Sequence, residues 1–259
     1  NKKFAQFIGV KAAKNEYLLF TDADCKPGSD KWIEKMVSGF TDKTELVLGY
    51  GGYLSRKGML NRYIRYDTLM IAMQYLGMAI RGVPYMGVGR NLAYKKMLFF
   101  RNRGFGQHSN LNSGDDDLFV NAVADSGNTA VEFRREAHTR SIPATTITSW
   151  FSQKSRHFTT ARYYKLNHKA LLIAEPASRV LFYSLFVILT SSEYLVPFTL
   201  AIFALRLIVQ TTIISLACRK LDEKGMTFYS VFFDIFSPLI NGVIYISNYI
   251  NRPGKNQWK

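Results

Sequence analysis

Two carboxylates stand one residue apart directly after a short apolar run. The run is Tyr17-Leu18-Leu19-Phe20, and Thr21-Asp22-Ala23-Asp24 follows it. Four apolar residues are enough for one buried β-strand, and open α/β sheets bind ligands at the carboxyl ends of their strands. Carboxylate oxygens suit a hard divalent cation, and a phosphorylated substrate can complete its coordination. We therefore predict that Asp22 and Asp24 bind a metal, although a solvated turn that closes the strand fits the local pattern equally well.

Two further polar clusters lie at domain-scale distances from this pair. The first is Gly114-Asp115-Asp116-Asp117, and the second is Gln153-Lys154-Ser155-Arg156-His157. Adjacent carboxylates repel one another, which can raise the pKa of one of them into the range of a general base. An exposed acidic helix cap is the alternative. Arg156 can donate two parallel hydrogen bonds to a phosphate, while residues 154–169 also fit a basic helix that attracts anionic lipid.

The composition describes a basic chain with enough apolar residues for a substantial core. Of its 259 residues 47% are hydrophobic, and the formal net charge is +15. This length fits one or two domains, and the charge fits nucleic acid, anionic lipid or a phosphorylated substrate. Because no nucleic-acid-binding motif is recognisable, we expect no nucleic-acid partner. Cys25 and Cys218 show neither a disulfide framework nor zinc-site spacing, which favours a reducing compartment.

Hydrophobic patterns predict alternating helices and strands in the first part of the chain. Helices are expected at residues 2–14, 27–40 (after a short loop), 60–80 and 116–126, and strands at residues 16–20, 45–54, 91–94 and 130–134. Such alternation predicts an α/β sheet. The buried stripe of the second helix is expected to hold Trp32, Ile33, Met36, Val37 and Phe40.

The chain changes character after Arg179, where long apolar stretches begin. We predict a membrane-spanning helical hairpin at about 177–218 with Glu193 in its turn and Arg206 facing protein or water. A buried hairpin in a soluble domain is the alternative. Basic residues flank both ends of the hairpin, which places these ends in the cytoplasm. A third segment, about 227–250, is interrupted by Asp234 and Pro238 and is expected to be interfacial or re-entrant.

Three segments, in this order, resemble the family 2 glycosyltransferases, which are membrane-associated GT-A enzymes related to cellulose and hyaluronan synthases. The segments are Lys-Ala-Ala-Lys-Asn-Glu-Tyr-Leu-Leu-Phe-Thr-Asp-Ala-Asp-Cys, Gly-Asp-Asp-Asp-Leu and Gln-Lys-Ser-Arg-His. The resemblance implies a Rossmann-like GT-A catalytic domain over residues 1–170, followed by a membrane-associated helical region over residues 171–259. It also implies that the strand that holds the nucleotide base would precede Asn1, so we expect an N-terminally truncated sequence.

The resemblance implies an inverting transfer from a nucleotide sugar, expected to be a UDP-sugar, to a glycan or lipid-linked acceptor. Asp24, and with it Asp22, would bind Mg²⁺ or Mn²⁺ and the donor diphosphate. Asp116 is the first candidate for the general base and Asp115 the second. An alignment with the family motif that starts from Gly114-Asp115-Asp116 selects Asp116, whereas one that starts from Leu118 selects Asp115. Gln153 would help to hold the diphosphate.

The same resemblance assigns the remaining candidates. Arg156 would bind the diphosphate, and His157 would contact the acceptor. His157 replaces the tryptophan of the family motif, and the loss of this broad stacking surface weakens the case for processive polymer synthesis. Gly87-Val88-Gly89-Arg90-Asn91-Leu92-Ala93-Tyr94 resembles the loop between donor and acceptor sites, so Arg90 and Asn91 are further acceptor candidates.

By analogy with the family, we expect a multi-pass protein of a bacterial inner membrane, with its catalytic domain in the cytoplasm and a role in polysaccharide biosynthesis. Membrane lipid would then be a partner. The alternative is a membrane-anchored sugar- or nucleotide-binding module without catalysis.

Overall fold

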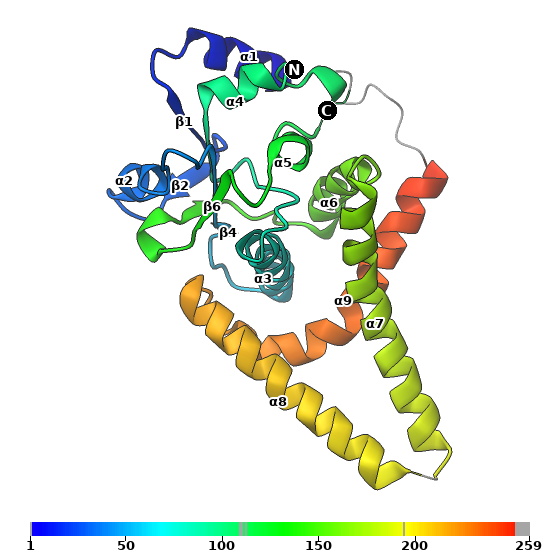
Figure 1. The fold of residues 1–259 in the computed structure, drawn as a ribbon. Helices are drawn as coiled ribbons and strands as arrows, with labels where there is room; N and C mark the ends of the chain where they lie inside the picture. Colours follow the sequence, from blue (N-terminus) through cyan, green and yellow to red (C-terminus); the bar gives the residue numbers. More distant parts are fainter. Residues whose placement is uncertain (1, 109–110, 112, 194, 252–259) are drawn as a thin grey trace.

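An α/β domain is followed by three long helices (Figure 1). The structure, a computed structural model, describes residues 2–108, 111, 113–193 and 195–251. The strands are β1 (Tyr17–Phe20), β2 (Cys25–Pro27), β3 (Leu46–Gly49), β4 (Gly51–Tyr53), β5 (Leu92–Lys95), β6 (Thr129–Glu132) and β7 (Thr139–Ser141). The helices are α1 (Lys2–Ala12), α2 (Trp32–Val37), α3 (Met59–Ile80), α4 (Lys96–Arg101), α5 (Asp117–Val123), α6 (Ile147–Ala161), α7 (Leu166–Ser191), α8 (Val196–Lys220) and α9 (Met226–Asn251), with 3₁₀ turns η1 (Gly106–His108) and η2 (Arg135–Ala137).

Two small sheets share the α/β domain. The first has the strand order β1-β5-β3-β6, and the second has the order β2-β7-β4. In the first sheet β3 is parallel to β6 and antiparallel to β5. The single strand that we predicted at residues 45–54 is divided at Tyr50 between the two sheets, so this segment links them. Gly49 lies at the division, where the side chain of Asn91 leaves no room for a Cβ atom.

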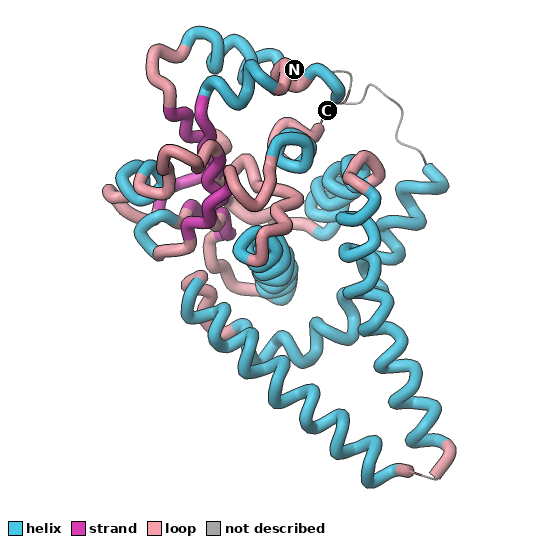
Figure 2. Tube along the Cα trace, viewed as in Figure 1, coloured by secondary structure: helices cyan, strands magenta, loops and turns pink. Residues whose placement is uncertain are grey.

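Helix α3 is the central packing element, and its predicted span of residues 60–80 is confirmed. It packs against β4 and β6 on one side and against α8 and α9 on another. Figure 2 shows this helix between the strands and the long helices. Tyr66, Leu69 and Tyr75 are almost fully buried, and burying such a side chain stabilises a fold by about 1.5–3 kcal/mol.

Two local expectations are wrong. We predicted a buried strand after residue 16, but β1 is an edge strand in which Tyr17 is 48% exposed and only Leu18 is buried. We placed Ile33 in the buried stripe of the second helix, but α2 is only six residues long and Ile33 is exposed, while Met36 is buried. Both errors have one cause, because the pattern of a short segment does not show how many neighbours will cover it.

The three C-terminal helices α7, α8 and α9 are long and apolar enough to cross a membrane, judged by length and composition. Helices α7 and α8 form the predicted hairpin, and Glu193 lies in its turn. The domain boundary expected near residue 170 falls inside α7, which continues through it. Helix α9 contains Pro238 and bends as it passes from below α3 to the side of α7 (Figure 1).

Ion pairs join the three long helices. Arg206 of α8 lies 2.8 Å from the Asp234 carboxylate and donates to the Tyr183 hydroxyl at 2.9 Å. Arg179 of α7 lies 3.3 Å from the other carboxylate oxygen of Asp234. Arg206 therefore faces protein, as predicted, and its charge is paired by an acid of α9.

Candidate active site

Asp22 and Asp24 lie in the turn between β1 and β2. The turn is closed by the backbone N–H of Cys25, which donates to the carbonyl of Asp22 at 3.0 Å. One carboxylate oxygen of Asp24 accepts a hydrogen bond of 2.6 Å from the Ser141 hydroxyl on β7. Asp24 is exposed to solvent, and Asp22 is partly exposed. Both carboxylates can therefore accept a ligand from solvent without leaving their places.

The ligand atoms of Asp22, Asp24 and Cys25 lie within 4.8 Å of one another, a spacing that fits one metal ion. Burial, followed by the charge of Asp24, raises the pKa of the Cys25 thiol, so the thiol stays protonated near pH 7. The effective donors are then two carboxylates. Such a hard oxygen set fits Mg²⁺ or Mn²⁺, with room left for oxygens of a substrate.

Lys2, at the start of α1, joins the first two acidic clusters. Its ammonium group lies 2.8 Å from Asp22 and 2.9 Å from Asp115. Burial acts to lower the pKa of Lys2, but the two carboxylates outweigh it and raise the pKa above its ordinary value. The ammonium therefore stays charged, and a cation bridges carboxylates from segments that are distant in the sequence.

The three adjacent aspartates have different surroundings. Asp116 caps the N-terminus of α5: one of its oxygens accepts from the Asp117 backbone N–H at 2.8 Å, and the other accepts from the Gly89 N–H at 2.6 Å. Burial, then the charges of Asp115 and Asp117, raise the pKa of Asp116 to about 7. A carboxylate with this pKa can take up and release a proton near neutral pH.

Asp117 points away from Asp116 and fixes the end of α6. Its carboxylate accepts a 2.8 Å hydrogen bond from the Tyr164 hydroxyl and a second bond from the Thr160 hydroxyl. The side chain is buried, and burial raises its pKa. Asp117 is therefore a structural acid that holds α6 against α5.

Arg90 lies in the loop before β5 and is partly buried beside the Asp22–Asp24 turn. Its guanidinium stacks on the Tyr53 ring at 4.4 Å, and the Tyr53 hydroxyl accepts from Gln153 at 3.2 Å. One terminal nitrogen of Arg90 is buried without a hydrogen-bond partner among the described residues. The Thr21 hydroxyl donates to the Arg90 carbonyl at 3.0 Å and so ties the loop to the Asp22 turn. A buried N–H without a partner is suited to an anionic ligand.

His157 and Arg156 lie on an exposed part of α6. Desolvation by neighbouring protein, then the charges of Arg90, Arg156 and Lys154, lowers the pKa of His157 below its ordinary value, whereas the charge of Asp22 opposes this shift. Both main causes act in one direction, so the accessible imidazole is neutral at pH 7. His157 thus lies within electrostatic range of Arg90 and Asp22, so the third polar cluster is near the first.

Other residues of the third cluster hold α6 in place. The ammonium group of Lys154 is buried against Asp67 of α3. The backbone carbonyl of Ser155 accepts a 2.9 Å hydrogen bond from Asn248 of α9. Two consecutive residues of the motif, Lys154 and Ser155, thus anchor the helix, while the Gln153 side chain is directed to Tyr53.

Asn91 is a structural residue of the loop. Its side chain is 0% exposed, its oxygen accepts from the Trp32 indole at 3.0 Å, and its amide donates to the carbonyls of Tyr50 and Ala137 at 2.9 and 2.7 Å. All its polar groups are satisfied within the protein. We therefore assign Asn91 no contact with substrate.

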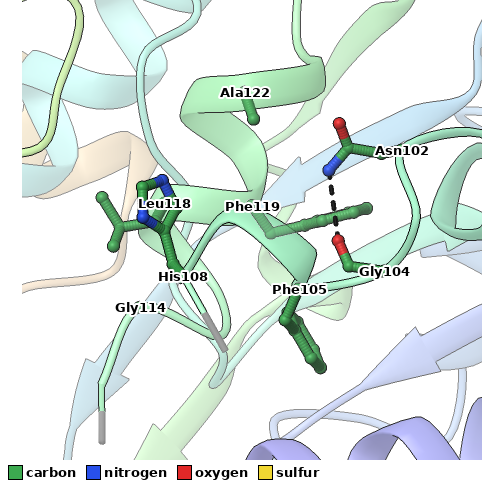
Figure 3. A pocket seen from close by; sticks show the side chains of 8 residues that line it. All are labelled: Asn102, Gly104, Phe105, His108, Gly114, Leu118, Phe119 and Ala122. Atoms are coloured by element: carbon green, nitrogen blue, oxygen red, sulfur yellow. Dashed lines mark hydrogen bonds between the residues drawn. The ribbon is translucent and has the colours of Figure 1, made fainter. Parts of the chain in front are cut away.

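Two hollows of the surface lie outside this constellation. The hollow in Figure 3, beside α5, has a volume of about 10 Å³, which suits one water and not a sugar. Phe105, Leu118 and Phe119 line it, and Asn102 donates to the Gly104 carbonyl at its rim. A hollow of about 340 Å³ lies along residues 9–20, and neither hollow is lined by the aspartates discussed above.

A family model described as Glycosyl transferase family 21 matches residues 1–258. The chain belongs to glycosyl transferase family 21. A glycosyltransferase was expected from the motifs, which led us to family 2 and not to family 21.

A solved structure shows the same fold as this glycosyltransferase. It is the mannosyltransferase PcManGT from Pyrobaculum calidifontis in complex with GDP-Man and Mn²⁺, with a TM-score of 0.50 and 16% sequence identity. The similarity covers 98% of this chain and 68% of the mannosyltransferase chain. The expected α/β fold followed by apolar helices is thereby confirmed. No curated protein matches the chain.

Three residues of the candidate site were not predicted from the sequence. Lys2 bridges the aspartate clusters, the Ser141 hydroxyl donates a hydrogen bond to Asp24, and the Tyr53 ring stacks against the Arg90 guanidinium. A lysine at the start of the helix that precedes the strand and the acidic turn is a signal that could have suggested Lys2. Ser141 lies in a strand of three residues, which is too short to show a period. Tyr53 lies in the predicted strand at residues 45–54, but no local pattern indicates that its ring stacks on Arg90.

Proposed function

We propose that this glycosyltransferase moves a sugar from a nucleotide-sugar donor to a glycan or lipid-linked acceptor, with inversion at the transferred carbon. The observation that carries the proposal is the double contact of Lys2, which brings the Asp22 turn and the Asp115–Asp117 segment to one place. The proposed metal ligands Asp22 and Asp24 are thereby close to the segment that contains the candidate base Asp116.

The donor side is assigned to the turn and the cations beside it. Asp24 and Asp22 would hold Mg²⁺ or Mn²⁺, and the bound metal would offset the charge of the departing nucleoside diphosphate. Arg90 offers an unpaired buried N–H near Cys25, so we assign it to the diphosphate and not to the acceptor. Arg156 would add a second guanidinium contact, and Gln153 fixes Tyr53 beneath Arg90.

The acceptor side is assigned to Asp116 and His157. Asp116 would take the proton of the acceptor hydroxyl as its oxygen attacks the anomeric carbon, while the bond to the diphosphate breaks on the opposite face. The raised pKa of Asp116, about 7, suits this proton transfer. Asp115 is partnered by Lys2 and Asp117 by Tyr164, which leaves Asp116 as the better base. His157, neutral and accessible, would contact the acceptor.

The long helices give the proposal a membrane setting. The α7–α8 hairpin would span the inner membrane, and α9, which packs along α3 and α6, would lie at its cytoplasmic interface. Basic residues at both ends of the hairpin support a cytoplasmic catalytic domain. A lipid-linked acceptor could then reach Asp116 from the bilayer surface.

The test is a transfer assay on the purified protein in lipid nanodiscs. Candidate UDP- and GDP-sugars are offered with Mn²⁺, Mg²⁺ or a chelator, and the release of nucleoside diphosphate and the anomeric configuration of the product are measured. We expect metal-dependent release with inversion, abolished in Asp24→Asn and in Asp116→Asn. Full turnover in both variants would remove the proposed site, and donor binding without turnover would favour a binding module.

A further inference from the structure

Glu223 is a buried acid in the turn that joins α8 to α9. Although the turn connects two apolar helices, the Glu223 side chain is 1% exposed. The Tyr50 hydroxyl donates to one carboxylate oxygen at 2.9 Å, Arg65 Nε donates to the other at 2.8 Å, and Arg140 pairs with the first. These partners belong to three different segments of the α/β domain. The turn of the long helices is thus inserted into the catalytic domain.

The same two arginines also hold the backbone of the turn. Arg140 donates to the carbonyls of Leu221 and Asp222 at 2.9 and 3.1 Å, and Arg65 donates to the carbonyl of Lys224 at 3.2 Å. Charge-assisted hydrogen bonds of this kind are stronger than neutral ones and define geometry. The turn is therefore fixed at its backbone as well as at its side chain.

Strand β7 links the α8–α9 turn to the proposed metal-binding turn of Asp22 and Asp24. Successive side chains of a strand point to opposite faces, and Arg140 points to Glu223 while its neighbours point the other way. Ser141 donates to Asp24 at 2.6 Å, and Thr139 donates to the carbonyl of Arg90 at 2.9 Å. One strand of three residues thus connects the α8–α9 turn to both proposed donor-binding groups.

The back of this sheet is shaped around the Arg140 guanidinium. Gly52 of β4 lies opposite Arg140 in the strand pairing, and a Cβ atom at Gly52 would clash with the guanidinium. The Tyr50 ring packs against the same guanidinium at 5.3 Å. Arg140 therefore has little freedom to adapt when its carboxylate partner is altered.

We propose that Glu223 is a positioning residue, which acts through Arg140 and Ser141 to hold Asp24 in its metal-binding position. The α8–α9 turn would then couple the membrane helices to the donor site. This inference rests on the proposed function, since it concerns how the donor-side carboxylate is placed.

The chain offers a matched control at the other end of α8. Glu193 lies in the turn between α7 and α8, has a positive φ of 59°, and is exposed. Glu193→Gln also removes one carboxylate charge, from the turn at the opposite end of α8, without altering the α/β domain. Both variants remove one carboxylate charge, and only Glu223→Gln alters the contact with Arg140 and its partners.

The experiment measures Mn²⁺ affinity without donor, from the electron paramagnetic resonance signal of free Mn²⁺ over the protein in nanodiscs. Loss of an outer partner of a ligand lowers metal affinity by about 10-fold or more, so we expect this loss in Glu223→Gln and in Ser141→Ala. Because both act on Asp24, the double variant should also lose about 10-fold and not about 100-fold. Glu193→Gln should bind as the wild type does. An unchanged Kd in Glu223→Gln, or losses that multiply in the double variant, would overturn the inference.

Hydrogen exchange separates this inference from the proposed function. Glu223→Gln should speed amide exchange in residues 25–27 and 139–141, and Glu193→Gln should not. This result is independent of sugar transfer, so altered exchange in a protein that transfers no sugar would refute the function alone. Unaltered exchange would refute the coupling. If Glu223→Gln does not fold, Arg140→Lys replaces it, since lysine keeps the charge and lacks the several N–H donors of the guanidinium. Mn²⁺ affinity is then compared among Arg140→Lys, Ser141→Ala and the double variant, and this comparison is decisive.

Discussion

The two acidic clusters of the site use the same side chain in opposite surroundings. Asp24 is exposed in a turn at the edge of the small sheet, where it accepts hydrogen bonds from the Ser141 hydroxyl and the Cys25 thiol. Asp116 is partly buried, held by two backbone N–H groups and flanked by two further carboxylates, and its pKa is raised to about 7. An exposed carboxylate can share a cation with substrate oxygens, whereas a partly buried one beside like charges can exchange a proton. Environment, more than residue type, thus separates a metal ligand from a base.

The largest effect is expected from Asp24→Asn. The change removes a ligand charge, and metal stabilisation of a leaving group is worth several kcal/mol, so kcat/KM should fall by about 1,000-fold or more. Transfer assays over a range of Mn²⁺ concentrations measure it. Asp30→Asn, at an exposed position in the next loop, is the control and should be unaffected. A loss below 10-fold would show that Asp24 is not the ligand.

The second effect is that of Asp116→Asn. Removal of a general base lowers kcat by about 100- to 10,000-fold, and asparagine preserves the helix cap. Donor binding, followed by fluorescence of a labelled nucleotide, should stay within about twofold of the wild type because the donor side is intact. If donor binding fell together with kcat, Asp116 would belong to the donor side and the division of roles would be wrong.

Much of the fold was predictable because its signals are local. The period of α3, the long apolar stretches and the apolar run before Asp22 each lie within one segment, and all three correspond to elements of the structure. Strands β2 and β7 were missed because three residues show no pattern. The bond of Ser141 to Asp24 joins residues 117 positions apart, and no local signal predicts such a pairing.

The candidate site was predictable in its motifs and not in its division of labour. The order of the three polar clusters indicated which residues to examine. Which aspartate of the triplet faces the site depends on how the backbone enters α5, where Asp116 becomes the cap and Asp117 turns toward Tyr164. Asn91 and Arg90 are neighbours in one loop, yet one is fully bonded inside the protein and the other has an unpaired N–H. These differences arise from tertiary packing.

The third prediction concerns pH. Asp116 acts as a base only when ionised, and its pKa is raised to about 7. The kcat/KM should therefore be level above pH 8 and fall about tenfold for each pH unit below about pH 6. A pH-rate profile at saturating Mn²⁺ measures this. The fall of kcat/KM at low pH should be absent from the residual activity of Asp116→Asn. If the fall persists in this variant, it is caused by the titration of another group.

The smallest effect is expected from Lys2→Met. The Lys2 side chain is 37% exposed and bridges Asp22 and Asp115, so its ammonium competes with a metal ion for Asp22. A pair with this exposure is worth up to about 1 kcal/mol, so Mn²⁺ should bind up to about fivefold more tightly. The free-Mn²⁺ signal measures the change, with Lys11→Met, on the same helix, as control. Weaker binding would show that Lys2 supports the metal site.

The division between the two acidic clusters is tested most directly by one titration: Mn²⁺ binding to the wild-type protein, Asp24→Asn and Asp116→Asn in the absence of donor. We predict that Asp116→Asn binds Mn²⁺ with the wild-type Kd and that Asp24→Asn binds it at least about 10-fold more weakly. Equal losses in both variants, or no loss in either, would contradict the assignment of Asp24 to the metal and Asp116 to the proton.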